Sequence, residues 1–304
     1  MINHIYLLII LIVITLIVFL FLHHLFLRKT FKLEQFSGIN RISHLREFPK
    51  TIYIFWDKGW ENAPYLCKEC LISWKYHNTE WKIIELDDNK LGNYLEEDIL
   101  RKINEIKSPQ HRADIIRVNI LNKHGGVWAD ASIFCNRPLD TWLHEYMKAG
   151  VFYFKYDKSS GLQDYKIGNW FIACEKNNYL MEKFCQKFNQ RWKYIVRDEY
   201  FGFHKVFKEL CDTDEIYNNI YNMIPFYDAR LPRITMPKFH KVEIDLSHKI
   251  TSEIETIVSD TNIPMFKFST KDNCPKNKED IDGTVFGYIL QMPSHQVKQV
   301  KNVI

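Results

Sequence analysis

Residues 108–140, SPQHRADIIRVNILNKHGGVWADASIFCNRPLD, contain the features that decide the fold of this chain. Ser108 can cap the N-terminus of a helix, and Pro109 suits the first helical position because its missing N–H costs nothing there. The residues that follow are apolar on most of the helix circumference, which favours burial on more than one side. The pattern therefore predicts a buried helix that begins after Ser108.

The end of this helix is equally well marked. Gly125 and Gly126 can supply the positive φ that stops a helix. Residues 127–129, VWA, are typical of a short buried strand, which delivers Asp130 at its C-terminal end. Open α/β sheets place their ligand chemistry at such strand ends, so Asp130 is a candidate functional residue.

Two charged residues interrupt the apolar helix. Asp114 and Arg117 are three positions apart, so they share one face and can form an ion pair. An unpaired charge in a buried helix would be costly. The pair has two interpretations: a salt bridge that only orients the helix, or side chains that contact a substrate.

Strands and helices alternate on both sides of this stretch. The alternation predicts an α/β fold with a mainly parallel sheet flanked by helices. The expected strands are residues 51–56, 81–86, 151–156, 167–173 and 265–271.

An uncharged apolar run over residues 5–22 is long enough as a helix to cross most of a bilayer core. We expect an N-terminal transmembrane anchor over residues 1–28, a stem over 29–48, the main domain over 49–280 and a C-terminal helical tail over 281–304. A cleaved signal peptide is the alternative, but no Lys or Arg precedes the run and no small-residue cleavage site follows it.

The charges beside the apolar run predict its orientation. Arg28, Lys29 and Lys32 follow it, so the positive-inside rule favours a single-pass protein whose main domain faces the cytoplasm. A Golgi or ER lumen is the alternative. The seven scattered cysteines do not form the pattern of a disulfide framework, which agrees with a reducing compartment.

The composition excludes several classes of function. A hydrophobic content of 46% is enough for a substantial core. The net charge is +4, and basic and acidic residues are interspersed, so nucleic acid is not an expected partner. The chain has no Gly-x-Ser-x-Gly or His-Glu-x-x-His motif, which speaks against the common hydrolases. Its oligomeric state cannot be predicted.

The block of residues 113–130, ADIIRVNILNKHGGVWAD, resembles the core motif of glycosyltransferases that contain a DXD sugar-binding region. That group includes capsular polysaccharide synthesis proteins and initiating α-mannosyltransferases. Residues 49–56, PKTIYIFW, are similar to the first strand of the family, and residues 169–173, NWFIA, resemble a later strand. Residues 266–271 are a weaker match to its C-terminal element.

The resemblance implies a GT-A fold, a Rossmann-like domain that binds a nucleotide-sugar, usually with Mn²⁺ or Mg²⁺. It also implies a retaining, hexosyltransferase-like transfer to a glycan or lipid-linked acceptor, in polysaccharide or glycoconjugate synthesis such as that of a capsule. The expected catalytic residues are Asp130, Asp114 and Arg117. The expected donor-binding residues are Trp56, Asp114, Arg117, Gly125, Gly126, Asp130, Asn169 and Trp170.

One departure from the DXD pattern affects the metal. Ser132 stands where the mannosyltransferase branch has a second aspartate, and a hydroxyl is a weak ligand for a hard cation. The expected metal ligand is Asp130, with Ser132 and His204 as candidates to assist it and Asp140 as a further one; each of these can also be an ordinary polar residue. The alternative function is a non-catalytic membrane protein that binds a nucleotide-sugar or glycan through a degenerate motif.

Overall fold

The computed structural model describes residues 14–23, 48–198, 201–240 and 242–292. The chain divides into two units, residues 1–46 and 47–304. In the first unit, the described residues 14–23 form a helix whose large apolar side chains are exposed.

Within the described ranges, no helix combines the length and the apolar character needed to cross a membrane. Most of the predicted anchor, and all but the last residue of the predicted stem, lie outside the described residues.

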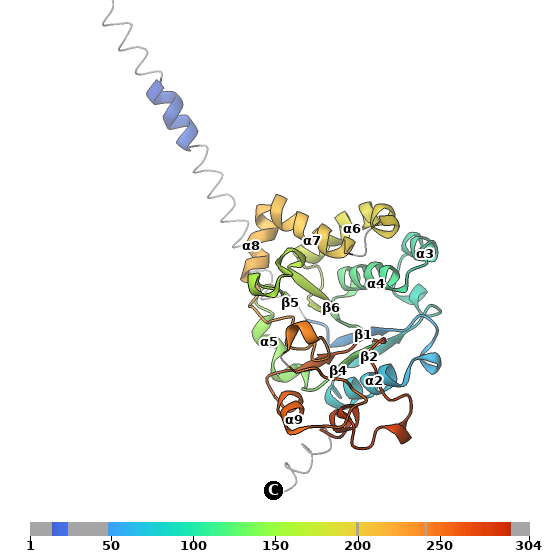
Figure 1. The fold of residues 1–304 in the computed structure, drawn as a ribbon. Helices are drawn as coiled ribbons and strands as arrows, with labels where there is room; N and C mark the ends of the chain where they lie inside the picture. Colours follow the sequence, from blue (N-terminus) through green and yellow to red (C-terminus); the bar gives the residue numbers. More distant parts are fainter. Residues whose placement is uncertain (1–13, 24–47, 199–200, 241, 293–304) are drawn as a thin grey trace, which may run out of the picture. The chain divides into compact units, whose positions relative to one another are not determined.

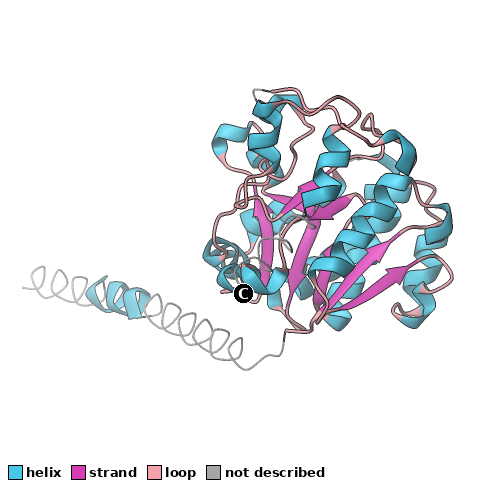
Figure 2. Cartoon of the chain, turned by 90° about the horizontal axis from the view of Figure 1, so that it is seen from below, coloured by secondary structure: helices cyan, strands magenta, loops and turns pink. Residues whose placement is uncertain are grey.

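A five-stranded sheet forms the centre of the second unit, in the order β2-β1-β3-β6-β5 (Figure 2). β1 pairs in parallel with both β2 and β3, whereas β6 is antiparallel to β3 and to β5. Four strands therefore run in one direction and β6 runs against them, so the predicted mainly parallel sheet is confirmed. The strands are β1 (Thr51–Phe55), β2 (Lys82–Leu86), β3 (Gly126–Ala129), β5 (Val151–Lys155) and β6 (Ile167–Cys174).

Helices cover both faces of this sheet. β1 leads to β2 on one side and β2 returns to β3 on the other, so right-handed crossovers place the two connections on opposite faces. Figure 1 shows α3, α4, α6 and α7 over one face, with α2 and α9 on the other. The helices are α2 (Tyr65–His77), α3 (Glu97–Asn104), α4 (Pro109–His124), α5 (Leu143–Tyr146), α6 (Tyr179–Asp198), α7 (Gly202–Thr213), α8 (Glu215–Met223) and α9 (Ser252–Val258).

The connections between these elements include single turns of 3-10 helix. They lie at Trp60–Asn62, Leu91–Asn93, Leu139–Thr141, Lys158–Ser160, Gln163–Tyr165, Pro237–Phe239 and Lys278–Asp280.

A second, two-stranded sheet lies on the α2 side of the molecule. β4 (Ile133–Cys135) pairs antiparallel with β7 (Met265–Lys267). The sequence predicted β7 but not β4, because a three-residue strand directly after Asp130 gives little periodic signal. The pairing fixes residues 265–268 beside residues 132–135.

The hydrophobic core on this face extends past the predicted domain boundary at residue 280. Val285, Phe286 and Ile289 are fully buried in one cluster with residues of α2, β4, α9 and β7. Residues 285–292 are helical, as expected for the predicted tail, but they belong to the domain. The remainder of that tail lies outside the described residues.

The predicted helix and its glycine stop are confirmed. Ser108 caps α4 by accepting a hydrogen bond from the His111 backbone N–H at 3.4 Å, and Pro109 occupies the first turn. Gly125 has φ +66° and Gly126 φ +92°. A Cβ on Gly125 would lie 2.7 Å from the Lys176 nitrogen, so both conformation and close packing require glycine there.

This arrangement brings the C-terminal ends of β1 and β3 side by side. Trp56 follows β1, and Asp130 follows β3. The chain passes from β1 to β2 on one side and then returns to β3 on the other side of β1. The ends of β1 and β3 therefore form a topological switch point of the sheet, where α/β folds bind ligands.

Candidate active site

Four charged side chains of alternating sign meet at the end of β3. The Arg117 Nη2 lies 3.3 Å from the Asp114 Oδ1, and its Nη1 lies 3.4 Å from the Asp130 Oδ1. On the other side, the Lys267 Nζ lies 3.3 Å from the Asp130 Oδ2. We call Asp114, Arg117, Asp130 and Lys267 the charged cluster. Its carboxylate at the strand end is held between two cations.

The cluster is held rigidly by hydrogen bonds from neighbouring elements. Arg117 donates through Nε to the Ala113 carbonyl at 3.2 Å and through Nη1 to the Asn169 carbonyl. The Asn169 side-chain amide donates to the Asp114 Oδ1 at 3.0 Å. Helix α4 and strand β6 are therefore joined through Arg117 and Asn169.

Aromatic residues complete the setting of Arg117 and Asp130. The indole N–H of Trp128 donates to the Asp130 Oδ1 at 3.0 Å. The Arg117 guanidinium lies 5.3 Å from the centre of the Trp128 ring and 6.0 Å from that of Phe203. Cation–π contacts of this kind stabilise a cation that is removed from water.

Ser132 and Lys267 are connected directly. The Lys267 ammonium donates to the Ser132 Oγ at 2.7 Å, and the Ser132 hydroxyl donates to the Phe268 carbonyl at 2.8 Å. The antiparallel pairing of β4 with β7 brings these residues together across 135 positions of sequence.

The cluster reaches solvent at one end only. The Asp130 side chain is 25% exposed and that of Lys267 13%, whereas Arg117 and Asp114 are 5% and 8% exposed. A ligand can therefore approach Asp130 and Lys267, while Asp114 and Arg117 support them from inside the molecule.

The pKa values follow from burial and from these pairings. Desolvation raises the pKa of Asp114 to about 6, although the charge of Arg117 opposes this. Burial would also raise the pKa of Asp130, but Arg117 and Lys267 together hold it below its ordinary value. Desolvation lowers the pKa of Lys267, and the charge of Asp130 acts in the opposite direction. As the pH falls, Asp114 therefore takes up a proton before Asp130 does.

Several predicted donor-binding residues lie outside the charged cluster. Gly125 and Gly126 are at the start of β3, at the opposite end of the strand from Asp130, where they allow close backbone packing. Trp170 is only 1% exposed; its ring stacks on Phe154, and its carbonyl accepts a hydrogen bond from the Asp130 N–H at 2.9 Å. Trp170 therefore supports Asp130 through its backbone.

Trp56 has a position suited to ligand contact. It follows β1 at the switch point, it is partly exposed, and its indole N–H has no hydrogen-bond partner within the described part of the chain. An unsatisfied donor beside a strand end is compatible with the predicted donor-binding role.

Two of the residues predicted to assist a metal ion, His204 and Asp140, have other partners in the structure. The His204 Nδ1–H donates to the Tyr165 carbonyl at 3.2 Å, and burial lowers the pKa of this histidine to about 4. Asp140 pairs with Lys50 at 2.9 Å, at the N-terminal edge of β1, whereas Asp130 lies at the C-terminal edge of the sheet.

The residues present at Asp130 do not fit a divalent cation. Each oxygen of its carboxylate already faces a cationic side chain, and the Ser132 hydroxyl is engaged with Lys267 and Phe268. Mg²⁺ takes six oxygen ligands, usually from one or two carboxylates together with substrate phosphates and waters, and a carboxylate that serves it must have an oxygen free. In the ranges that the structure describes, no group of three or more His, Cys, Asp or Glu residues could hold a metal ion. The expectation of Mn²⁺ or Mg²⁺ stays an untested prediction.

Sequence reasoning missed Lys267 and Arg233. In the sequence, Lys267 stands between Phe266 and Phe268 in a predicted strand, and a charged residue in such an apolar segment could have indicated a site. Arg233 follows Pro232, whose carbonyl accepts a hydrogen bond from the Lys267 backbone N–H at 2.7 Å. Only the tertiary structure places this loop residue near the site.

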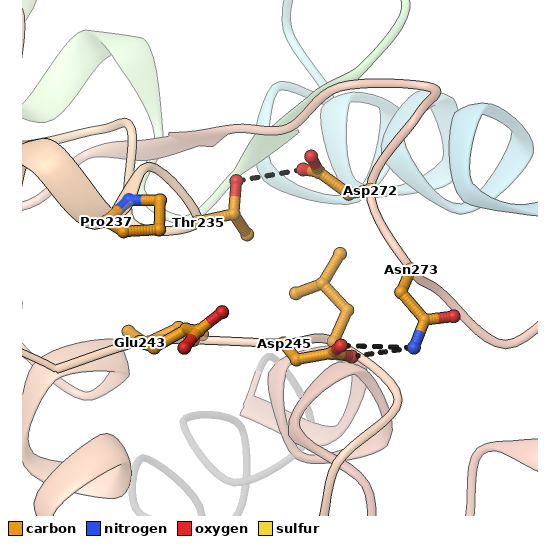
Figure 3. Close-up of a pocket in the computed structure, with 8 residues that line it drawn as sticks. Thr235, Pro237, Glu243, Asp245, Asp272 and Asn273 are labelled. Atoms are coloured by element: carbon orange, nitrogen blue, oxygen red, sulfur yellow. Dashed lines mark hydrogen bonds between the residues drawn. The ribbon is translucent and has the colours of Figure 1, made fainter.

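A separate small pocket of about 140 Å³ lies away from the charged cluster (Figure 3). Its lining includes Asp245 and Asp272, which accept hydrogen bonds from Asn273 and Thr235. Its acidic groups are tied to neighbouring side chains, and its negative charge is unsuited to an anionic ligand.

Comparison with known proteins places this geometry in a family. The profile of the family described as capsular polysaccharide synthesis protein matches residues 23–289, which include the whole charged cluster. The chain belongs to this family. The resemblance of residues 113–130 predicted a group of glycosyltransferases that includes capsular polysaccharide synthesis proteins, and this family assignment is confirmed. The DXD motif is not confirmed.

Curated relatives carry glycosyltransferase names. "Probable glycosyltransferase FCK3" of Fusarium pseudograminearum is 30% identical over 162 residues, which cover 47% of this chain and 39% of that protein. "O-glycosyltransferase braB" of Annulohypoxylon truncatum is 24% identical over 176 residues, covering 51% and 40%. The chain thus spans about two fifths of the length of these relatives.

Among solved structures, "PaToxG Glycosyltransferase" is 12% identical, with 64% of this chain and 82% of that chain covered. The TM-score is 0.37, which is too low to argue from.

Proposed function

We propose that this chain is a glycosyltransferase that moves a sugar from a nucleoside-diphosphate-sugar to a hydroxyl of a glycan or lipid-linked acceptor. The observation that carries the proposal is the charged cluster at the switch point, where a buried Asp114–Arg117 pair supports a partly exposed Asp130 and Lys267. The family assignment and the names of the relatives agree with it. We also propose that the domain is of the GT-A type.

The chemistry requires stabilisation of a leaving group. The bond between the anomeric carbon and the diphosphate oxygen breaks, the acceptor oxygen bonds to that carbon, and the acceptor proton passes to a base. The developing negative charge on the diphosphate needs fixed positive charge nearby, which is where preorganised sites contribute most. Lys267 offers such charge at the surface, and Arg117 holds Asp130 in place behind it.

A retaining, hexosyltransferase-like reaction is part of the proposal. Retention does not require a strong carboxylate base on the acceptor side, because an oxygen of the departing diphosphate can accept the proton. Such a reaction would serve the synthesis of a polysaccharide, as the family description suggests, or of another glycoconjugate.

The test is a turnover screen with a panel of UDP- and GDP-sugars, in which release of the nucleoside diphosphate is measured with EDTA and, separately, with Mn²⁺. We expect release from at least one donor, and Asp130→Asn should reduce it by about a hundredfold, because Lys267 loses the carboxylate that positions it to stabilise the leaving group. No release from any donor under either condition would refute the proposal.

A matched control is Asp140→Asn. Asp140 is also an aspartate in an ion pair with a lysine, but it is 46% exposed at the other edge of the sheet, so its loss should leave turnover unchanged. Thermal unfolding of both variants shows whether a loss of turnover reflects loss of the fold.

The engaged Ser132 hydroxyl favours one alternative, a non-catalytic protein that binds nucleotide-sugar or glycan. Such a protein would bind a donor from the panel, measured by calorimetry, without releasing nucleoside diphosphate.

A single-pass membrane location with the domain in the cytoplasm is a further proposal, supported by the apolar run over residues 5–22 and the basic residues after it. Fractionation of cells that express the full chain, with a carbonate wash and protease protection, tests it. Recovery of the protein in the wash would contradict the anchor.

A further inference from the structure

Lys267 contacts both Asp130 and Ser132, the two residues that stand at the acidic positions of the DXD pattern. In that pattern the residue two positions after Asp130 is a second acidic ligand, but here it is Ser132. The Lys267 ammonium lies between the two, at 3.3 Å from the Asp130 carboxylate and 2.7 Å from the Ser132 hydroxyl. One side chain thus contacts both positions from which a metal would be held.

The surroundings of Lys267 fix its head group. β7 pairs with β4 on one side, and the Pro232 carbonyl accepts the Lys267 backbone N–H at 2.7 Å on the other. The side chain is 13% exposed, so its ammonium is held at the surface of the site and does not swing freely in solvent. An ammonium held in this way keeps hydrogen-bonding capacity for a third acceptor.

A further cation lies close by. Arg233 is adjacent to Pro232, and its guanidinium is 5.8 Å from the centre of the Trp170 ring. Among the described residues, the buried Nε–H of Arg233 has no hydrogen-bond partner. Its charge acts on Lys267, so Arg233 adds to the positive potential that an anion at Lys267 would meet.

We propose that Lys267 supplies the positive charge which a divalent cation supplies in DXD enzymes, so that this site binds the diphosphate of its donor without a metal ion. The proposal rests on the proposed function for the identity of the donor. Asp130 then orients an ammonium, and the serine at position 132 is the residue that such a contact requires, because a second carboxylate there would be free to recruit a metal.

The test measures binding of inorganic pyrophosphate to the full chain by calorimetry, with EDTA present and then with Mn²⁺. We expect binding in EDTA that Mn²⁺ strengthens no further. Lys267→Met should weaken it by at least about tenfold, since a hydrogen bond to a charged group is lost. Lys267→Arg, which keeps the charge, should retain most of the affinity.

The matched control is Lys271→Met, which removes an exposed lysine four residues further along and should leave the affinity unchanged. If Lys267→Met does not fold, pyrophosphate binding by the wild type and by Lys267→Arg, each with EDTA and with Mn²⁺, still tests whether binding needs a metal ion. Pyrophosphate binding that appears only with Mn²⁺, or that Lys267→Met leaves intact, overturns the inference.

Failure of the inference and failure of the proposed function are distinguishable. Sugar transfer that occurs only with Mn²⁺ overturns the inference and leaves the glycosyltransferase proposal standing. Metal-free pyrophosphate binding through Lys267 without turnover of any donor supports the anion site and refutes the transferase.

Discussion

Asp114 is a charged residue in an environment that disfavours its charge. It lies inside a helix that is buried on most sides, where Arg117 and the Asn169 amide contact its carboxylate and the charge of Asp130 opposes its ionisation. Burial raises its pKa from 3.8 to about 6. Ionising a buried carboxyl group of this kind costs free energy in the folded protein. Groups with such raised pKa values are typical of functional sites.

The pKa of Asp114 predicts how stability depends on pH. Because the native state binds this proton more tightly than the unfolded chain, the stabilisation from protonated Asp114 is complete below pH 3.8 and is lost as the pH rises through 6. Asp114→Asn does not titrate. Its free energy of unfolding, relative to wild type, should therefore rise by about 2 kcal/mol between about pH 4 and pH 7.5.

Urea unfolding at the two pH values measures this change. Asp140→Asn is the matched control, because it makes the same change at a side chain that is 46% exposed. A relative stability of Asp114→Asn that falls as the pH rises would show that Arg117 outweighs desolvation.

At the scale of elements, the turn that connects α4 to β3 sets the position of the site. α4 carries Asp114 and Arg117, and β3 carries Asp130, so the turn through Gly125 determines their distance. A Cβ at Gly125 would meet the Lys176 nitrogen at 2.7 Å and the Cys174 carbonyl oxygen at 3.0 Å. Both neighbours are backbone atoms and cannot move aside cheaply.

Gly125→Ala should therefore destabilise the protein by about 3 kcal/mol, through the steric clash and a backbone conformation (φ +66°, ψ −162°) that is nearly exclusive to glycine. Gly161→Ala is a partial control: Gly161 has the same φ of +66° but a ψ of 6°, in the left-handed region, and nothing lies within 4 Å of its would-be Cβ. Equal losses for the two variants, measured by urea unfolding, would mean that the close packing at Gly125 is not required.

At the scale of the whole molecule, the face of the sheet opposite α4 depends on segments far apart in sequence. Its hydrophobic cluster joins α2 and β4 to β7, α9 and residues 285–289. Phe286 is fully buried, with its ring 6.1 Å from Tyr65 and 6.3 Å from Phe268, which follows Lys267. The late part of the chain thus holds β7 and its lysine against the site.

Phe286→Ala should destabilise the domain by about 3 to 5 kcal/mol, the usual cost of a large cavity in a core. Phe226→Ala removes the same ring at a position that is 52% exposed, and should change stability by about 0.5 kcal/mol or less. Chemical unfolding compares the two variants. A small loss for Phe286→Ala would mean that residues 285–289 are an appendage, as their placement in a separate tail implied.

The sequence by itself determined the local features around Asp130. The cap at Ser108, the apolar helix, the two glycines and the short strand are properties of neighbouring residues, and each was predicted because backbone propensity and periodicity act over a few positions. Asp114 and Arg117, one helical turn apart, were recognisable as a pair for the same reason. The α/β class followed from the alternation of such segments.

Only the tertiary structure decided what surrounds Asp130. The pairing of β4 with β7 sets Lys267 beside Ser132 across 135 positions, and the antiparallel β6 brings the Asn169 carbonyl to Arg117. Contacts of this kind depend on which strands become neighbours, and that choice is made by packing of the whole core, which no local pattern encodes. The single carboxylate that the sequence left without a partner is therefore flanked by two cations in the folded molecule.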